Sequence, residues 1–243
     1  MVLEEGERGP MLCLGAILDS LPPQCGDVPI ENWEWDRVNG EARQADTIWG
    51  HYYVRGTFDG TTFVVIDAGP PRKGRGSESD PIGTPCEEPP GGWQTTVPDL
   101  AGRGDVNRAN AAVKTDPEFA GLWIEYLDEQ MDSAAEDPSD ILLNVAFTAN
   151  LERHEQELRE HWGGPLCVIR HDRSHTRLEQ IESELSGEVG RNLGLQPLFS
   201  SLDVENNVVE LEVVAIDERI REAVGRRYGK DAVRITAALH RVR

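Results

Sequence analysis

The sequence VVELEVVAI, residues 208–216, decides how the C-terminal half of the chain folds. Within it the apolar Val209 and Leu211 alternate with the charged Glu210 and Glu212. A period of two is typical of a β-strand, because successive side chains of a strand point to opposite faces of the sheet. The stretch therefore predicts a strand with one face packed on helices and two glutamates directed outward.

Regular elements are predicted on both sides of this strand. Capping residues and apolar stripes indicate helices over residues 176–185 and 218–228, and apolar runs indicate strands over residues 166–170, 198–204 and 233–239. From residue 166 the order is β-α-β-β-α-β, the split β-α-β or ferredoxin-like pattern of an antiparallel sheet with helices on one face. We find no exact internal repeat, and expect the strand-helix-strand pattern over residues 141–170 to extend the same sheet.

The segment before these elements is less regular. Residues 70–115 are rich in proline and glycine and predict a linker or long loop. Asp116 followed by Pro117 is a favourable helix start, because aspartate caps backbone N–H groups and proline fits the first turn. Residues 122–127 fit either a helix or a strand. Together with the elements that follow, they predict an α+β domain over residues 116–243.

The beginning of the chain is predicted to be a small β-rich domain, residues 1–69. Polar and apolar residues alternate before Asp59 and Gly60, a dipeptide typical of a two-residue hairpin turn. Trp33 and Trp35 are two positions apart, so we expect them on one face of another strand. Packing in a small core is the expected role of these tryptophans, rather than sugar binding.

The charge of the chain excludes two kinds of partner. The sequence has 44 acidic and 24 basic residues, which give a formal net charge of -20. Such a surface repels phosphate backbones and anionic membranes, so we expect no nucleic-acid partner. No apolar run approaches the roughly 20 residues that a membrane-spanning helix needs.

The four cysteines favour disulfides over a zinc site. They have no C-x-x-C spacing, and their number is even. We predict the pairs Cys13 with Cys25, which brackets a short Pro-Pro loop, and Cys86 with Cys167, which would fix the linker to the start of a core strand. Disulfides imply export and therefore a signal peptide or lipid anchor upstream of Met1, and membrane contact only through such an anchor. Four buried thiols in a cytosolic protein are the alternative.

No group of residues forms a recognisable catalytic or metal-binding motif. Four histidines lie close together in the sequence, but only His171 and His175 have an i,i+4 spacing, and Thr176 is the expected helix cap, which places both in a loop. We expect solvated side chains there, and predict no metal site and no cofactor. Nucleophile motifs such as G-x-S-x-G are absent, and the apolar neighbours of Cys167 would raise the pKa of its thiol. The sequence does not exclude a hydrolase that uses two carboxylates from distant parts of the chain.

Several short motifs resemble an uncharacterised family of exported or lipid-anchored actinobacterial proteins. The motifs are PMLCLG at residues 10–15, PPQC at 22–25, WG at 49–50, GTFDG at 56–60, PCEEPPGGW at 85–93 and GGPLC at 163–167. The resemblance extends to the C-terminus. It implies an extracytoplasmic location and no particular activity.

A second, fainter resemblance is to the prodomains of actinobacterial serine proteases of the α-lytic type. It rests on FAGLWI at residues 119–124, the strand at 143–148 and the segment 203–209 with Asn207. Such prodomains chaperone and inhibit their protease. The resemblance therefore implies an inhibitory role, although no protease follows Arg243 and residues 1–115 lie outside the match.

The sequence favours a binding protein over an enzyme. We expect a non-catalytic, extracytoplasmic protein-binding module of the cell envelope that meets its partner through the sheet face marked by Glu210 and Glu212. The simpler interpretation of these two glutamates is a solvated face that guards against aggregation. The alternatives are a secreted hydrolase that uses dispersed carboxylates, a prodomain-like protease inhibitor or chaperone, and a structural envelope component. The sequence leaves the oligomeric state open.

Overall fold

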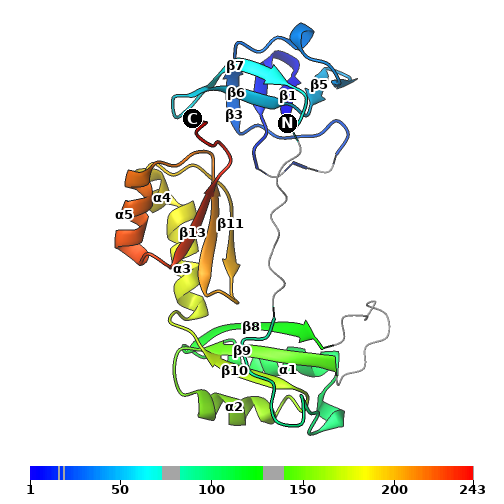
Figure 1. The fold of residues 1–243 in the computed structure, drawn as a ribbon, viewed down its shortest axis with the longest axis vertical. Helices are drawn as coiled ribbons and strands as arrows, with labels where there is room; N and C mark the ends of the chain where they lie inside the picture. The colour runs from blue at the N-terminus through cyan, green and yellow to red at the C-terminus, as the bar shows by residue number, and fades with distance from the viewer. Residues whose placement is uncertain (16, 19, 73–82, 128–139, 243) are drawn as a thin grey trace.

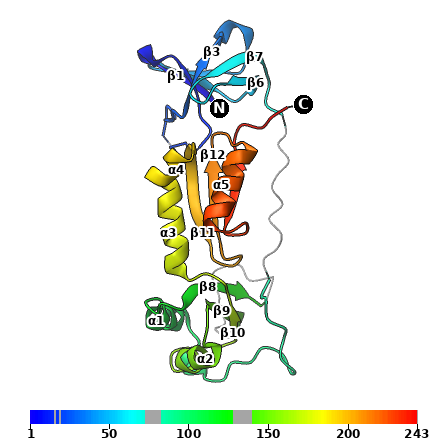
Figure 2. The ribbon, with the colours of Figure 1, turned by 90° about the vertical axis from the view of Figure 1, so that its left-hand side faces the viewer.

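The computed structural model describes residues 1–243 except 16, 19, 73–82, 128–139 and 243. It is a mixed α+β structure with a seven-stranded sheet and two three-stranded sheets. In Figures 1 and 2 the seven-stranded sheet lies at one end, the sheet that contains residues 119–170 lies at the other, and the C-terminal sheet lies between them. The chain therefore passes from one end to the other and then returns to the middle.

The seven-stranded sheet is built entirely from the first 69 residues. Its strand order is β4-β5-β1-β2-β3-β7-β6. The strands are β1 (Val2–Glu5), β2 (Pro10–Leu12), β3 (Val28–Glu31), β4 (Ala42–Gln44), β5 (Thr47–Gly50), β6 (Tyr53–Phe58) and β7 (Phe63–Gly69), with short 3-10 helices η1 (Gly6–Arg8) and η2 (Trp35–Arg37).

The predicted hairpin is confirmed between β6 and β7. Asp59 Oδ1 accepts the backbone N–H groups of Thr61 and Thr62 at 2.8 Å each, and Gly60 has a φ of 106°. A positive φ is open to glycine without steric cost, so the dipeptide fits this turn.

The two tryptophans do not lie in a strand. Trp33 follows the end of β3 and Trp35 opens η2. Both rings pack around Tyr52, with centroids 5.1 and 6.1 Å from its ring. Both contact the apolar core of this sheet, which is the role expected for them.

The rest of the chain folds as two units with the same order of elements, α-β-β-α-β. The first unit, residues 103–170, has α1 (Arg103–Val113), β8 (Phe119–Tyr126), β9 (Ile141–Phe147), α2 (Leu151–Arg159) and β10 (Leu166–Arg170), preceded by η3 (Pro98–Leu100). The second unit, residues 175–237, has α3 (His175–Ser186), the additional α4 (Glu188–Asn192), β11 (Pro197–Asp203), β12 (Val208–Val213), α5 (Glu218–Tyr228) and β13 (Val233–Ala237). In each unit the first two strands pair antiparallel, and a helical crossover brings the third strand parallel to the second.

The structure does not show the expected ferredoxin-like sheet. The strand Leu166–Arg170 was expected to open that sheet, but it pairs in parallel with β9, with Leu166 opposite Leu143. The C-terminal sheet consequently has three strands, and its β12–β13 pair is parallel. The physical reason is local: α2 returns the chain alongside β9, so a β-α-β unit is complete before α3 begins. The strand-helix-strand pattern over residues 141–170 thus belongs to a separate sheet.

Two further expectations differ from the structure, and one open assignment is settled. The range 70–115, expected as a linker or loop, contains α1, a helix in which Asp105, Ala109 and Val113 are the buried residues. Asp116 does not cap a helix: its Oδ1 accepts the N–H of Glu118 at 2.7 Å in a turn, and the chain then enters β8. Residues 122–127, which fitted either a helix or a strand, lie mainly in the strand β8.

In both units the helices cover one face of the sheet, as expected. In the first unit Val113 of α1 and Leu158 of α2 pack on Leu143, Val145 and Phe147 of β9, all with 0% exposure. In the second unit α3 and α5 contribute the same kind of apolar layer over β12, whose residues 209, 211 and 213 are buried.

The opposite face of the first sheet is also covered. Leu142, Asn144 and Ala146 of β9 point to this face and have 0% exposure. Thr84 donates a hydrogen bond of 2.8 Å to Asn144 Oδ1, and Cys86 forms a disulfide with a cysteine of β10. The segment that carries Thr84 and Cys86 therefore lies against the outer face of this sheet.

The structure contains both predicted disulfides. Cys13 pairs with Cys25 over a sequence separation of 12, and Cys86 pairs with Cys167 over a separation of 81. Described residues include no free cysteine.

Removal of the two disulfides is expected to destabilise the protein unequally. In the loop-entropy model a bridge restricts the unfolded chain more when the loop is longer, which gives about 3 kcal/mol for Cys13–Cys25 and about 4.5 kcal/mol for Cys86–Cys167. We expect the C86A/C167A variant to lose more free energy of unfolding in urea than C13A/C25A. Equal losses would contradict the expectation that the Cys86–Cys167 disulfide, which closes the longer loop, stabilises the protein more.

Candidate functional site

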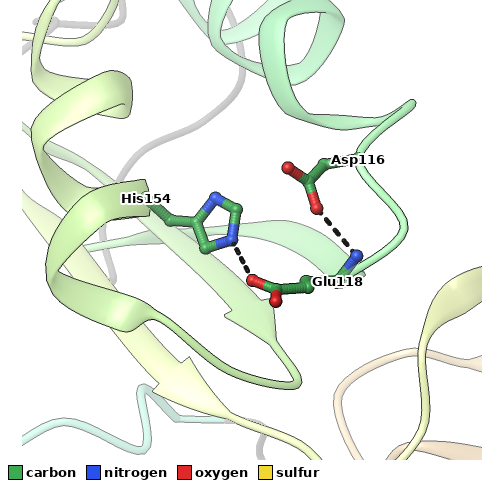
Figure 3. Close-up of side chains that lie close together, drawn as sticks. All are labelled: Asp116, Glu118 and His154. Atoms are coloured by element: carbon green, nitrogen blue, oxygen red, sulfur yellow. Dashed lines mark hydrogen bonds and ion pairs between the residues drawn. The ribbon is translucent and has the colours of Figure 1, made fainter.

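A cluster of charged side chains joins α2 to the beginning of β8. Figure 3 shows Asp116 and Glu118, from the turn that precedes β8, and His154, from the first turns of α2, directed toward one another. One potential ligand atom from each of the three lies within 4.8 Å of the other two. Among the described residues this is the group with the composition of a metal site.

His154 holds a fixed position in the cluster. Its side chain has 0% exposure, and its ring stacks on Phe147 at 3.8 Å with an interplanar angle of 4°. Its Nε2 lies 2.9 Å from Glu118 Oε2. Its Nδ1 is buried without a hydrogen bond among the described residues, and Glu157 Oε2 lies 3.8 Å away.

Arg153 brings a positive charge into the same cluster. Its Nη2 lies 3.2 Å from Asp116 Oδ2, 3.3 Å from Glu118 Oε2 and 2.8 Å from His154 Nε2. Asn150 Nδ2 donates a further hydrogen bond of 2.8 Å to Glu118 Oε1. A guanidinium group thus contacts all three potential metal ligands.

These contacts lower the pKa of both carboxyl groups. The hydrogen bond from His154 is the largest cause for Glu118, and Asn150 and Arg153 lower its pKa further. Burial by itself would raise the pKa of Asp116, but the N–H of Glu118 and the guanidinium of Arg153 outweigh it, so this pKa is lowered too. Both groups are therefore held in their charged forms.

Sequence reasoning missed this cluster because it treated the histidines as solvated. A signal was present: His154 lies three residues after Leu151 and four before Leu158, on the apolar side of the predicted helix. His171 is not solvated either, since its ring stacks on Trp123 at 6.3 Å and burial lowers its pKa. The partners Asp116 and Glu118 are far from α2 in sequence, and only the fold brings them together.

The predicted partner-binding glutamates lie on the outer face of the second unit. Glu210 pairs across the sheet with Arg234, and Arg234 Nη1 lies 2.6 Å from Glu210 Oε1 and 2.9 Å from Asp203 Oδ2. Glu212 has Phe199 and Thr236 as its cross-strand neighbours. Within the described part of the chain, no ion pair of Glu212 is present. Glu210 is thus neutralised locally, whereas Glu212 adds a negative charge to this face.

Among the described residues, no segment is seen to cover this outer face as one covers that of the first unit. Phe199 is 57% exposed, although large aromatic side chains are usually mostly buried. Arg234 and Thr236 are exposed as well. The two sheets share one topology, yet the first has a cover on its outer face and the second presents an aromatic side chain beside a carboxylate.

A third group of carboxylates lies where the two units meet. Burial raises the pKa of Glu205, and the negative charges of Asp203 and Glu125 raise it further. Glu205 and Glu125 each have one buried oxygen without a hydrogen bond among the described residues. We take these two acids as the candidate for the expected pair of dispersed carboxylates.

No protein-family model matches this sequence, and no curated protein matches it either. The resemblances to exported actinobacterial proteins and to protease prodomains therefore stay expectations. Within the described residues, no helix has the length and apolar character needed to cross a membrane.

The charged cluster predicts a specific loss of stability in acid. Glu118 binds fewer protons in the folded than in the unfolded protein, so its stabilisation is complete above the ordinary carboxyl range, about pH 4 to 4.5, and is lost as the pH falls through its lowered pKa. The E118Q variant cannot ionise at this position. We expect its melting temperature to fall less steeply than that of the wild type below about pH 5.

Thermal unfolding followed by circular dichroism in a chelating buffer measures this difference. E152Q, which changes an exposed carboxylate on α2, is the matched control and should keep the wild-type slope. Parallel curves for the wild type and E118Q would show that the cluster does not contribute in this way.

Proposed function

We propose that this protein is a non-catalytic protein-binding module that works outside the cytoplasm, at the cell envelope, and binds its partner through the outer face of the second unit. The observation that supports the proposal is the difference between two sheets of the same topology. The outer face of the first has buried Leu142 and Asn144, whereas that of the second exposes Phe199. An exposed aromatic side chain on this face offers a partner a large apolar contact area.

The chemistry of this face indicates the chemistry of the partner. Phe199 offers an apolar contact and the adjacent Glu212 offers a negative charge, while Glu210 is already paired with Arg234. A partner segment that places an apolar side chain next to a basic one is complementary to this arrangement. The net charge of -20 also steers basic partners toward the chain.

The extracytoplasmic location is supported by the two disulfides, which form and persist in oxidising compartments. A protease of the α-lytic type is one partner class to test, because a prodomain-like inhibitor would use such a surface. A structural role would instead produce stable homo-oligomers that do not depend on this face.

The proposal is tested with variants of the open face in the full chain. F199S and E212K, alone and together, are compared with I66S and E222K, which make the same kinds of change at other exposed positions. Partners are recovered from the envelope fraction of the source cells, and affinity is then measured with the purified partner and with secreted serine proteases. We expect the double variant to lose about 30-fold or more in affinity, which corresponds to about 2 kcal/mol, the cost of a hot spot. Recovery that is unchanged in the double variant, with an intact fold, would remove this face as the binding surface.

A second candidate function is a secreted hydrolase, and the raised pKa of Glu205 beside Glu125 favours it. A carboxyl group with a raised pKa keeps its proton to a higher pH than an ordinary one and can act as a general acid toward a leaving group, while a nearby carboxylate acts as a base or nucleophile. Hydrolysis of a panel of chromogenic glycosides should then fall about 100-fold or more in E205Q and stay unchanged in E188Q, an exposed control. No hydrolysis by the wild type, or equal hydrolysis by both variants, would exclude this function for Glu205.

A further inference from the structure

The side chain of His154 has two close neighbours that require opposite states of its Nε2 atom. Arg153 Nη2 lies 2.8 Å away, and because guanidinium nitrogens only donate, this contact requires an unprotonated Nε2. Glu118 Oε2 lies 2.9 Å away, and because carboxylate oxygens only accept, this contact requires an N–H. A single state of Nε2 cannot make both contacts favourable.

The surroundings do not let the imidazole avoid this conflict. The ring of His154 is fully buried and stacks on Phe147, so it cannot turn away. When Nε2 is unprotonated, its lone pair faces Glu118 Oε2 at 2.9 Å, and the carboxylate of Asp116 adds further negative charge. A cation that accepts electron pairs from all three groups at once would make every one of these contacts favourable.

We propose that Asp116, Glu118 and His154 bind a divalent transition-metal ion of the zinc type, which takes the place that Arg153 Nη2 has in this structure. One imidazole nitrogen and two carboxylate oxygens are ligands that Zn²⁺ accepts, at about 2.0 to 2.2 Å each. The three atoms already lie within 4.8 Å of one another, so small side-chain movements bring them to these distances. Ca²⁺ and Mg²⁺ prefer shells made of oxygen alone and suit a histidine nitrogen poorly.

Arg153 has another position available when the metal binds. Its side chain is 54% exposed, and its Nη1 already lies 3.8 Å from Glu157 Oε2, one helical turn further along α2. The three carboxylates of Asp116, Glu118 and Glu157, the guanidinium and one dication together carry no net charge. The ion therefore compensates negative charge that Arg153 alone leaves in place.

The second nitrogen of His154 is also placed as metal sites require. A ligating imidazole usually donates its other N–H to a carboxylate, which fixes the tautomer and makes the ligand more basic. Glu157 Oε2 lies 3.8 Å from the buried, unpartnered Nδ1 and is the carboxylate nearest to it among the ion pairs of His154. Asp116 and Glu118, with side chains 21% and 27% exposed, leave the site accessible from solvent.

The test uses the purified full chain after treatment with a chelator. Zn²⁺ is titrated by calorimetry, and Co²⁺ is added as a spectroscopic probe whose visible absorption reports nitrogen and oxygen ligands. We expect one ion per chain. D116N and E118Q should each weaken the affinity about 10-fold or more, since loss of even an outer-shell partner costs 10- to 100-fold. R153Q should strengthen it about 10-fold, because a competing positive charge is removed.

H175Q is the matched control, because His175 is another histidine with a carboxylate neighbour, Glu179, at 3.5 Å. It should bind Zn²⁺ and Co²⁺ as the wild type does. The partly exposed D116N and E118Q carry the test, since replacement of buried His154 could unfold the first unit, and circular dichroism verifies the fold of each variant. Absence of Zn²⁺ binding in both the wild type and R153Q, binding that survives in D116N/E118Q, or equal affinity for Ca²⁺ would each overturn the proposal.

Discussion

A three-stranded sheet with helices on one side leaves its other side to be covered by something else, and this constraint shapes the whole molecule. In the first unit, another segment of the same chain covers this side of the sheet. The covering segment, which includes Thr84 and Cys86, is rich in proline and acidic residues and has few apolar groups that could hold it in place. The Cys86–Cys167 disulfide attaches the segment to the sheet where apolar packing is insufficient. Cys167 is the cross-strand neighbour of the buried Asn144, to which Thr84 is hydrogen-bonded.

The second unit connects the other parts of the protein. Asn207, in the turn between β11 and β12, accepts the N–H of Arg173 at 2.9 Å and donates to its carbonyl at 2.8 Å. Its φ of 55° is one that asparagine tolerates better than most residues. In the same turn Val204 lies so close to Gly121 of β8 that a Cβ there would be 2.8 Å from the valine Cβ. At the other end of the unit, Val214 is part of the core of the seven-stranded sheet. One short strand with its flanking turns therefore contacts both neighbouring parts.

The elements that depend on local signals could be predicted from the sequence. The alternation at residues 208–213 gives β12, and Asp217 caps α5 by accepting the N–H of Ile220 at 2.9 Å. The hairpin at Asp59 and both disulfides were predictable for the same reason, since turn chemistry and cysteine number are visible in the sequence.

The features that depend on contacts between distant parts of the sequence could not be predicted. The strand at residues 166–170 was recognised, but its assignment to a sheet requires knowing which neighbour it pairs with, and apolar periodicity does not encode the partner. Helix α1 was missed because it buries small or polar residues such as Asp105 and Ala109 rather than an apolar stripe. The residues of the site were missed for similar reasons. His154 was expected to be solvated but is buried, and Asp116 was expected to cap a helix but lies in a turn. The common element order of the two units is likewise not visible in the sequence, because the chain has no exact internal repeat.

The two units have the same order of elements but different polar clusters. In the second unit the main polar cluster links α5 to α3, where Glu184 Oε2 accepts hydrogen bonds from Tyr228 at 2.7 Å and from Arg227 at 3.0 Å. Arg227 Nε also donates a hydrogen bond of 3.0 Å to the Tyr228 hydroxyl, so the carboxylate, the phenol and the guanidinium all contact one another. In the first unit the cluster links α2 to the turn before β8, and the buried imidazole of His154 lies within hydrogen-bond distance of both Arg153 and Glu118. The proposed ion-binding cluster therefore lies on the unit whose outer sheet face is covered, and the proposed docking surface lies on the other unit.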